Sequence, residues 1–204
     1  IDLSKKETPF VLLNRQVPAL ADRCISLDNE LGGYLATSHL LAQGHRHIGY
    51  IAGPMWKTDA RDRFHGHQRA LSEYQLAADD ALFFEGDFRE TGGSKGLQML
   101  LASGRPFSAV VCANDEMASG ALTAARELGY EVPADFSVIG FDNVNFAYYT
   151  YPKLSTIDYP ISAMGHMAAR WVLKQVYKQS SIDVQQVFNP YLIPRDSVAE
   201  AATT

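Results

Sequence analysis

Two polar side chains directly follow apolar segments of the sequence. Asn114 comes after the run 109–113, and Asp142 comes after the run 138–141. An amide and a carboxylate can together donate hydrogen bonds to a small polar ligand and accept them from it. Both residue types are also frequent as helix N-caps and turn residues. The two roles are compatible, because a side chain at the end of a strand can still face a ligand.

Arg63 is a third polar residue to consider. It lies in a predicted helix that follows the apolar segment 47–53. The planar fork of a guanidinium can donate hydrogen bonds to two adjacent oxygens. The alternative is a solvated helix charge, or an ion pair with Asp59 or Asp62.

Metal binding and catalysis find little support in the sequence. His45 and His47 are two residues apart at the start of a strand, and His65 and His67 are two apart on a predicted helix, where they do not share a face. No carboxylate or cysteine cluster completes a metal site. The chain has no G-x-S-x-G nucleophile elbow, no phosphate loop and no G-x-G-x-x-G after a strand. We therefore expect no metal, no cofactor and no enzyme activity.

Short strands alternating with helices would position these side chains. Apolar runs without polar alternation predict buried strands at 10–13, 24–27, 47–53, 81–85, 109–113 and 138–141. Helical patterns lie between them, and three helices end at Gly44, Gly104 and Gly129. This order predicts an α/β fold with doubly wound parallel sheets and right-handed crossovers. In such sheets, ligands bind at the carboxyl ends of the strands.

The pattern changes after Asp142. Residues 145–152 are aromatic and turn-like, 154–158 could form a strand, and a helix is predicted from Pro160 to about Gln179. Late strands are predicted at 184–188 and 191–193. We expect the tail from Ala199 to be disordered.

Size and charge narrow the function classes. The 204 residues are 47% hydrophobic, enough for one or two α/β domains, and the net charge of −5 makes this chain by itself a poor candidate for gripping DNA phosphates. No apolar run has the roughly 20 residues of a membrane span. Cys24 and Cys112 lie far apart in apolar runs, which favours buried, reduced thiols. We expect a cytoplasmic protein without membrane contact.

Several motifs together resemble the effector-binding core of lactose/galactose-repressor family transcription regulators, with the galactose-repressor branch most similar. In chain order they are Leu13-Asn14-Arg15, Leu27-Asp28-Asn29, Gly44-His45, Ile48-Gly49-Tyr50, Arg61-x-Arg63-x-x-Gly66, Asn114-Asp115-x-Met117-Ala118-x-Gly120, Ser137-Val138-Ile139-Gly140-Phe141-Asp142, Leu154-Ser155-Thr156-Ile157 and Arg195-Asp196-Ser197. Each piece is weak alone, but together they cover nearly the whole chain in order.

The resemblance implies a periplasmic-binding-protein-like fold of two lobes. Residues 1–27 and 160–185 would form part of the N-lobe, and residues 28–159 and 186–204 would form the C-lobe. On this reading the chain starts part-way through the N-lobe. The N-lobe is then incomplete, and the helix-turn-helix DNA-binding domain of the family is absent.

The resemblance also implies a set of effector-binding residues: Asn14, Arg63, Phe88, Asn114 and Asp142. Asp142 would accept charge-assisted hydrogen bonds from sugar hydroxyls. The Phe88 ring would pack on the apolar face of a pyranose, although a phenylalanine at the edge of the core is the alternative.

The function implied is a sugar-responsive repressor, with galactose or a related hexose binding between the lobes. The protein would form a homodimer and would contact operator DNA only through the absent N-terminal domain. Two alternatives stay open: a transport-associated sugar-binding protein of the same fold, and a nucleotide-binding enzyme.

Overall fold

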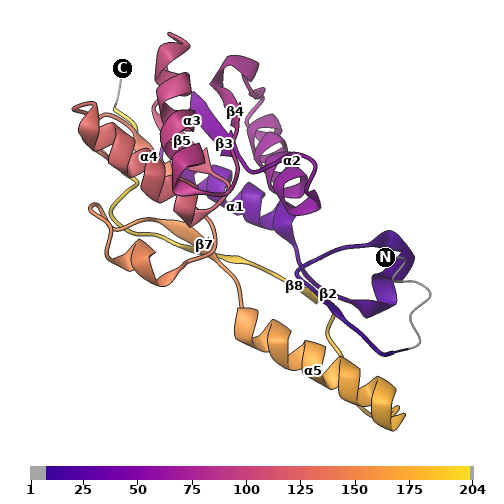
Figure 1. Ribbon diagram of the computed structural model, residues 1–204. Helices are drawn as coiled ribbons and strands as arrows, with labels where there is room; N and C mark the ends of the chain where they lie inside the picture. Colours follow the sequence, from indigo (N-terminus) through magenta and orange to yellow (C-terminus); the bar gives the residue numbers. More distant parts are fainter. Residues whose placement is uncertain (1–7, 203–204) are drawn as a thin grey trace. The chain divides into compact units, whose positions relative to one another are not determined.

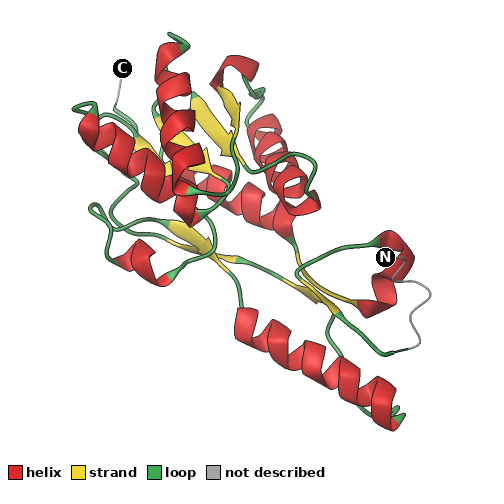
Figure 2. Cartoon of the chain, in the orientation of Figure 1, coloured by secondary structure: helices red, strands yellow, loops and turns green. Residues whose placement is uncertain are grey.

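The computed structural model describes residues 8–202, which form two compact units (Figures 1 and 2). Unit 1 contains residues 8–28 and 159–190, and unit 2 contains residues 29–158 and 191–202. Residues 1–7 and 203–204, which the predicted lobes included, lie outside the described residues.

The unit boundaries differ from the predicted lobe boundaries mainly near the C-terminal end. Residues 186–190 were expected in the C-lobe, but the structure groups them with unit 1. The physical reason is strand pairing, because β8 (Val187–Phe188) pairs in parallel with β2 (Cys24–Leu27). Short strands of this kind carry no sequence signal that names their partner.

Unit 2 is organised around a parallel four-stranded sheet. Its order is β4-β3-β5-β6, with β3 at Ile48–Ala52, β4 at Phe83–Glu85, β5 at Ala109–Cys112 and β6 at Ser137–Ile139. Every residue of β3, β5 and β6 is buried. Full burial requires cover on both faces, which is why these strands read as continuous apolar runs. The prediction of an α/β fold with a parallel sheet is confirmed.

Four helices cover this sheet in two pairs. They are α1 (Asn29–Ala42), α2 (Thr58–Glu73), α3 (Glu90–Ala102) and α4 (Asp115–Glu127), and α1 packs on α2 while α3 packs on α4. Gly44, Gly104 and Gly129 follow α1, α3 and α4 with φ of 91°, 68° and 83°. The predicted ends of these three helices are therefore confirmed, because each needs a left-handed residue that glycine adopts without strain.

Glycines at the helix crossings bring the paired backbones into direct contact. A Cβ added to Gly33 of α1 would lie 1.9 Å from the Arg63 carbonyl oxygen of α2, and one on Gly66 would lie 2.0 Å from the Glu30 carbonyl oxygen. The α3–α4 pair repeats this reciprocal arrangement, with Gly93 against Met117 and Gly120 against Glu90. In each helix, the residue contacted lies one turn before that helix's own glycine. The Gly33 contact therefore fixes where the Arg63 backbone of α2 lies against α1.

Unit 1 contains a smaller parallel sheet in the order β1-β2-β8, where β1 spans Leu12–Leu13. The 3₁₀ segment η2 (Pro18–Arg23) joins β1 to β2, and α5 (Ile161–Tyr177) packs on both strands. The Trp171 indole N–H donates to the Asp22 carbonyl at 2.7 Å, which ties α5 to η2. No helix among residues 8–202 combines the length and apolar character of a membrane span.

The last described residues return to unit 2. The strands β7 (Thr156–Asp158) and β9 (Tyr191–Ile193) pair antiparallel, and the 3₁₀ segments η3 (Asp80–Leu82) and η4 (Asn145–Tyr148) complete the unit.

The prediction of a disordered tail from Ala199 is wrong for residues 199–202. The Ala199 N–H donates to Ser137 Oγ at 3.1 Å, its carbonyl bonds to the His45 ring at 3.0 Å, and the Ala201 N–H donates to the Gln43 carbonyl at 2.8 Å. The composition of the tail did not reveal these backbone partners.

Candidate ligand-binding site

The carboxyl ends of the unit 2 strands gather four of the predicted site residues. The loops that follow β4, β5 and β6 carry Phe88, Asn114 and Asp142 respectively. Arg63 comes from the second turn of α2, which follows β3. Because the strands are parallel, these loops meet at one edge of the sheet.

Arg63 is buried, with 4% of its surface exposed, and its guanidinium is held by two hydrogen bonds. Its Nε donates to Asn29 Oδ1 at 2.9 Å, and its Nη1 donates to the Ala113 carbonyl at 2.5 Å. Asn29 begins α1, and Ala113 follows β5. These two acceptors fix the plane and direction of the fork, so Arg63 is not the solvated helix charge considered as an alternative.

The rest of the Arg63 guanidinium faces an aromatic ring and a carboxylate. Its central carbon lies 3.5 Å from the centre of the Phe141 ring and 6.0 Å from that of Phe88. Its Nη2 lies 3.6 Å from Asp142 Oδ1, which is an ion pair slightly too long for a hydrogen bond. The structure thus places Asp142 beside Arg63 as an ion-pair partner.

Asp142 combines an uncommon backbone conformation with a partly accessible carboxylate. Its φ is 112°, and its side chain is 25% exposed. Burial raises the pKa of this carboxyl, and the Arg63 guanidinium opposes that rise. Asp59 and Glu116 add to the rise through their negative charge. The carboxylate therefore has one cationic neighbour and can accept from further donors.

Asn114 is the N-cap of α4, as the structural alternative proposed. Its Oδ1 accepts from the Met117 N–H at 3.0 Å. Its Nδ2 donates to the Phe88 carbonyl at 2.9 Å, so the same side chain also anchors the loop after β4. An amide nitrogen has two protons, and a second donor position is compatible with both structural bonds. Contact between Asn114 and a ligand stays a prediction.

Phe88 sits on a tight loop with φ of 68° and packs its ring against the sheet edge. A Cβ on Gly53 would lie 2.1 Å from a ring atom, so only glycine lets the ring approach β3 this closely. The Lys57 ammonium lies 5.0 Å from the ring centre. Lys57 was not among the residues predicted from the sequence.

Asn14 belongs to unit 1, whereas the other four predicted residues belong to unit 2. It follows β1 with φ of 52°, and its N–H donates to the Ile25 carbonyl at 2.8 Å. Its Oδ1 is buried and has no hydrogen-bond partner within the described part of the chain. A buried acceptor of this kind is uncommon in folded proteins and calls for an explanation.

Known proteins resemble this chain over almost its full length. A family model described as a periplasmic binding protein-like domain matches residues 37–198. A LacI-family sugar-binding transcriptional regulator from Escherichia coli, in complex with phosphate, is 31% identical with a TM-score of 0.88, covering 95% of this chain and 69% of that one. The chain belongs to the LacI family of transcriptional regulators.

Two further relatives refine the position of this LacI-family chain. It is 42% identical to the HTH-type transcriptional regulator GalR of Salmonella typhimurium, over 99% of the chain and 59% of that protein. A LacI-family regulator from Enterococcus faecium with bound ribose is 30% identical with a TM-score of 0.86, covering 95% of this chain and 72% of that one. The chain thus spans about three fifths of the length of GalR, and these relatives are regulators, not enzymes.

Two residues of this LacI-family site were missed from the sequence. Asn29 was named only within the motif Leu27-Asp28-Asn29 and was given no role in ligand binding, although its amide orients Arg63 from 34 positions away. Phe141 was read only as the last apolar residue of a strand. A sequence pattern shows that Phe141 is buried but cannot show that its ring faces a guanidinium.

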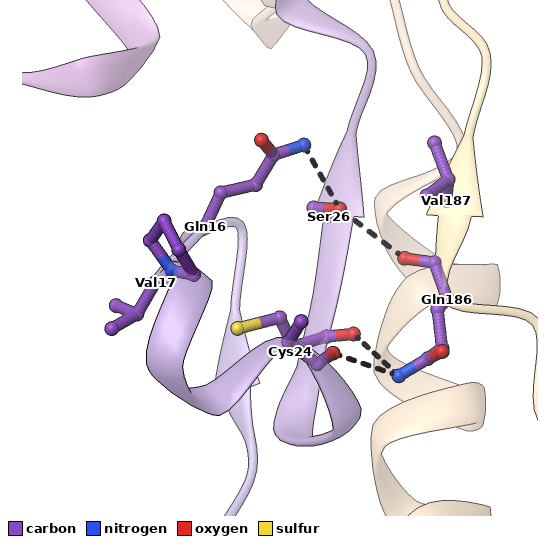
Figure 3. Close-up of a pocket in the computed structure, with 8 residues that line it drawn as sticks. Gln16, Val17, Cys24, Ser26, Gln186 and Val187 are labelled. Carbon is purple, nitrogen blue, oxygen red and sulfur yellow. Dashed lines mark hydrogen bonds between the residues drawn. The ribbon is translucent and has the colours of Figure 1, made fainter.

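A separate pocket of about 260 Å³ lies in unit 1 of the LacI-family chain, and Figure 3 shows its lining. Its polar side chains form hydrogen bonds with one another and with the backbone. Gln16 Nε2 donates to Ser26 Oγ at 3.4 Å, and Gln186 Nε2 donates to the Ala21 carbonyl at 3.0 Å. The pocket contains none of the predicted site residues. Within residues 8–202, no group of three or more histidine, cysteine or acidic side chains is arranged to hold a metal ion.

Proposed function

We propose that this chain is the effector-binding part of a sugar-responsive transcriptional repressor. The observation that carries the proposal is the buried Arg63 beside Asp142 at the carboxyl edge of a parallel sheet. Opposite charges side by side present strong donors and strong acceptors within a few ångströms. A vicinal diol needs both, because each hydroxyl donates one hydrogen bond and accepts others.

An aromatic ring beside the charged pair favours a sugar over other polyols. Phe88 lies next to Arg63 and is held by Gly53 and Asn114. A pyranose has polar hydroxyl edges and an apolar C–H face, which such a ring can cover. The cellobiose and ribose named in the structures of two related regulators support this class of ligand. Similarity to GalR favours galactose or a related hexose.

Asn14 would be a further effector contact. An unpartnered buried acceptor is unfavourable unless a ligand or water supplies a donor. An effector whose affinity differs between two conformations of the protein would favour one of them. That differential affinity, typically a few kcal/mol, is what would let the effector change operator binding by the DNA-binding domains of the whole protein. A regulator of this kind would act in the cytoplasm.

An exposed aromatic segment supports dimer formation. Tyr149 and Tyr151 are 81% and 96% exposed, and Tyr148 is 53% exposed. We propose that a second copy covers this segment, because clustered aromatic side chains are costly to leave in water. Sedimentation of the full-length protein would test it. Tyr149→Asp should shift dimer toward monomer, and an unchanged mass would contradict this surface.

Calorimetry with the full-length protein tests the site. Arg63→Ala should weaken binding of D-galactose, D-ribose or cellobiose, whichever the wild type binds, by about ten- to hundredfold, because a charge-assisted bond contributes roughly 1.5–3 kcal/mol. The matched control is Arg69→Ala, an arginine of the same helix that pairs with Glu30 at the surface and should leave affinity unchanged. If the two substitutions changed sugar affinity equally, the assignment of Arg63 to the binding site would be wrong.

The transport-associated alternative predicts a different protein context. A sugar-binding protein used in transport would not bind operator DNA. A gel-shift assay with the whole protein and the regulatory DNA beside its gene separates the two. Sugar-sensitive DNA binding supports the repressor, and sugar binding without DNA binding supports the alternative.

A further inference from the structure

The turn that carries Asp142 is held in a conformation that side chains rarely adopt. Asp142 has φ of 112°, and the next residue, Asn143, has φ of 51°. Two successive residues other than glycine in the left-handed region are unusual and persist only when their surroundings fix them. The orientation of the Asp142 carboxylate depends on this turn.

Asp115 binds the backbone on both sides of that turn. Its N–H donates to the Phe141 carbonyl at 2.7 Å, and its Oδ2 accepts from the Val144 N–H at 3.0 Å. Its other oxygen, Oδ1, accepts from the Thr156 hydroxyl at 2.6 Å. Asp115 is completely buried, so water does not compete for these bonds.

The space for the Asp115 carboxylate is built into the neighbouring strand. A Cβ on Gly140 would lie 2.2 Å from Asp115 Oδ1, so any other residue there would push the carboxylate away. Gly140 directly follows β6 and lies two residues before Asp142. The carboxylate thus occupies a fitted position between α4, β6 and β7.

Other contacts also hold the turn. The Asp142 N–H donates to the Ile157 carbonyl at 2.8 Å, and the Asn143 N–H donates to Thr156 Oγ1 at 3.4 Å. Asn143 Nδ2 donates to Asp158 at 3.0 Å, and Asn143 Oδ1 accepts from Arg195 Nη2 at 2.6 Å. These bonds fix the residue after Asp142. The hydrogen bond from the Val144 N–H goes to Asp115 and to none of these other side chains.

We infer that Asp115 is a positioning residue for effector binding, which orients the Asp142 carboxylate without contacting the ligand. The inference rests on the proposed function of Asp142. The mechanism is geometric: with the Val144 N–H released, the turn relaxes and the carboxylate leaves its place beside Arg63.

Asp115→Asn tests the inference with little change in shape. The amide oxygen still accepts from Thr156, but its NH₂ group faces the Val144 N–H and cannot accept from it. We expect about a tenfold loss of sugar affinity in calorimetry with D-galactose, D-ribose and cellobiose. The matched control is Ser197→Ala, which removes a buried hydroxyl bonded to Val138 and Ser155 in the same unit. It should lower the melting temperature and leave affinity unchanged.

A double-mutant cycle separates positioning from general destabilisation. In an Asp142→Asn background, Asp115→Asn should change affinity less than twofold, because its partner in binding is already lost. The same tenfold loss in both backgrounds would overturn the inference. If Asp115→Asn does not fold, Thr156→Val replaces it, and unchanged affinity in that folded variant overturns the inference.

The outcomes also distinguish this inference from the proposed function. If Asp142→Asn weakens sugar binding and Asp115→Asn does not, only the positioning role is wrong. If Asp142→Asn has no effect, or the wild-type protein binds none of the three sugars, the proposed site fails and the positioning role fails with it.

Discussion

The guanidinium carbon of Arg63 lies 3.5 Å from the centre of the Phe141 ring. The negative face of an aromatic ring stabilises a cation, and a planar guanidinium can stack on it. Stacking reinforces the plane and direction that the hydrogen bonds to Asn29 and Ala113 give the group. The donors toward Asp142 are therefore in place before any ligand arrives.

Arg63→Lys should weaken sugar binding almost as much as Arg63→Ala, by about tenfold or more. A lysine keeps the charge, but it cannot bond Asn29 and Ala113 and face Asp142 at once. Calorimetry of the three proteins gives the comparison. A lysine variant with wild-type affinity would show that charge alone is sufficient.

Phe141→Leu should reduce sugar affinity by about two- to thirtyfold, because it removes a cation–π interaction of roughly 0.5–2 kcal/mol while keeping an apolar side chain. The matched control is Phe136→Leu, another buried phenylalanine of unit 2, which packs on Phe107 and Tyr130 and does not touch Arg63. Both variants should lose stability. Only the first should bind sugar more weakly, and a parallel loss in both would contradict the role of the ring.

Gly33→Ala and Gly66→Ala should each destabilise the protein by about 1–3 kcal/mol, since the new methyl group overlaps the backbone of the facing helix. Gly165→Ala in α5 is the control, because its Cβ would meet nothing within 4 Å. That substitution should stabilise the helix by roughly 0.5–1 kcal/mol. Urea denaturation measures all three, and equal midpoints for Gly66→Ala and Gly165→Ala would refute the close crossing.

Two buried groups should make stability depend on pH in opposite directions. Burial lowers the pKa of His67 to about 3 from 6.5, so the unfolded chain binds the extra proton and stability falls as pH falls below about 6.5. Burial raises the pKa of Asp115 to about 7 from 3.8, although its bonds from Thr156 and Val144 oppose this. The folded state therefore holds the extra proton, and stability rises as pH falls from about 7.

Between pH 7 and 5 these contributions should nearly cancel in the wild type, and single substitutions should separate them. Relative to the wild type over this range, His67→Gln should gain about 2 kcal/mol on acidification and Asp115→Asn should lose about as much. Denaturation at the two pH values measures both differences. Parallel pH profiles for all three proteins would contradict the burial of these groups.

The sequence was most informative where a structural feature depends only on the residues that form it. Gly44, Gly104 and Gly129 end helices because of their own backbone freedom, so their roles followed from position alone. The parallel sheet was predicted from uninterrupted apolar runs, because strands that are buried on both faces are apolar along their whole length. Residue type and position singled out Arg63 and Asp142, and the family resemblance implied that both bind the effector. The structure shows an ion pair between them.

The features that the sequence did not reveal depend on contacts between residues that are far apart in the chain. Asn29 and Phe141 orient Arg63 only after three elements have packed together. The pairing of β8 with β2, and the bonds that hold residue 199, also join segments more than 60 positions apart. Local propensity contains no information on such pairings, so the sequence predicted neither the pairing of β8 with β2 nor the hydrogen bonds of residues 199–202.

The hydrogen bonds of residues 191–201 determine when unit 2 can complete its folding during synthesis. When residue 190 has been added to the growing chain, all four strands of the unit 2 sheet have been made. His45, Ser137 and the N–H of Ser155 still lack their partners at Ala199 and Ser197. The strand that pairs with β7 is also not yet made. Unit 2 is thus completed only once residues 191–199 have been made, and a chain that stopped at residue 190 would lack these partners of its sheet.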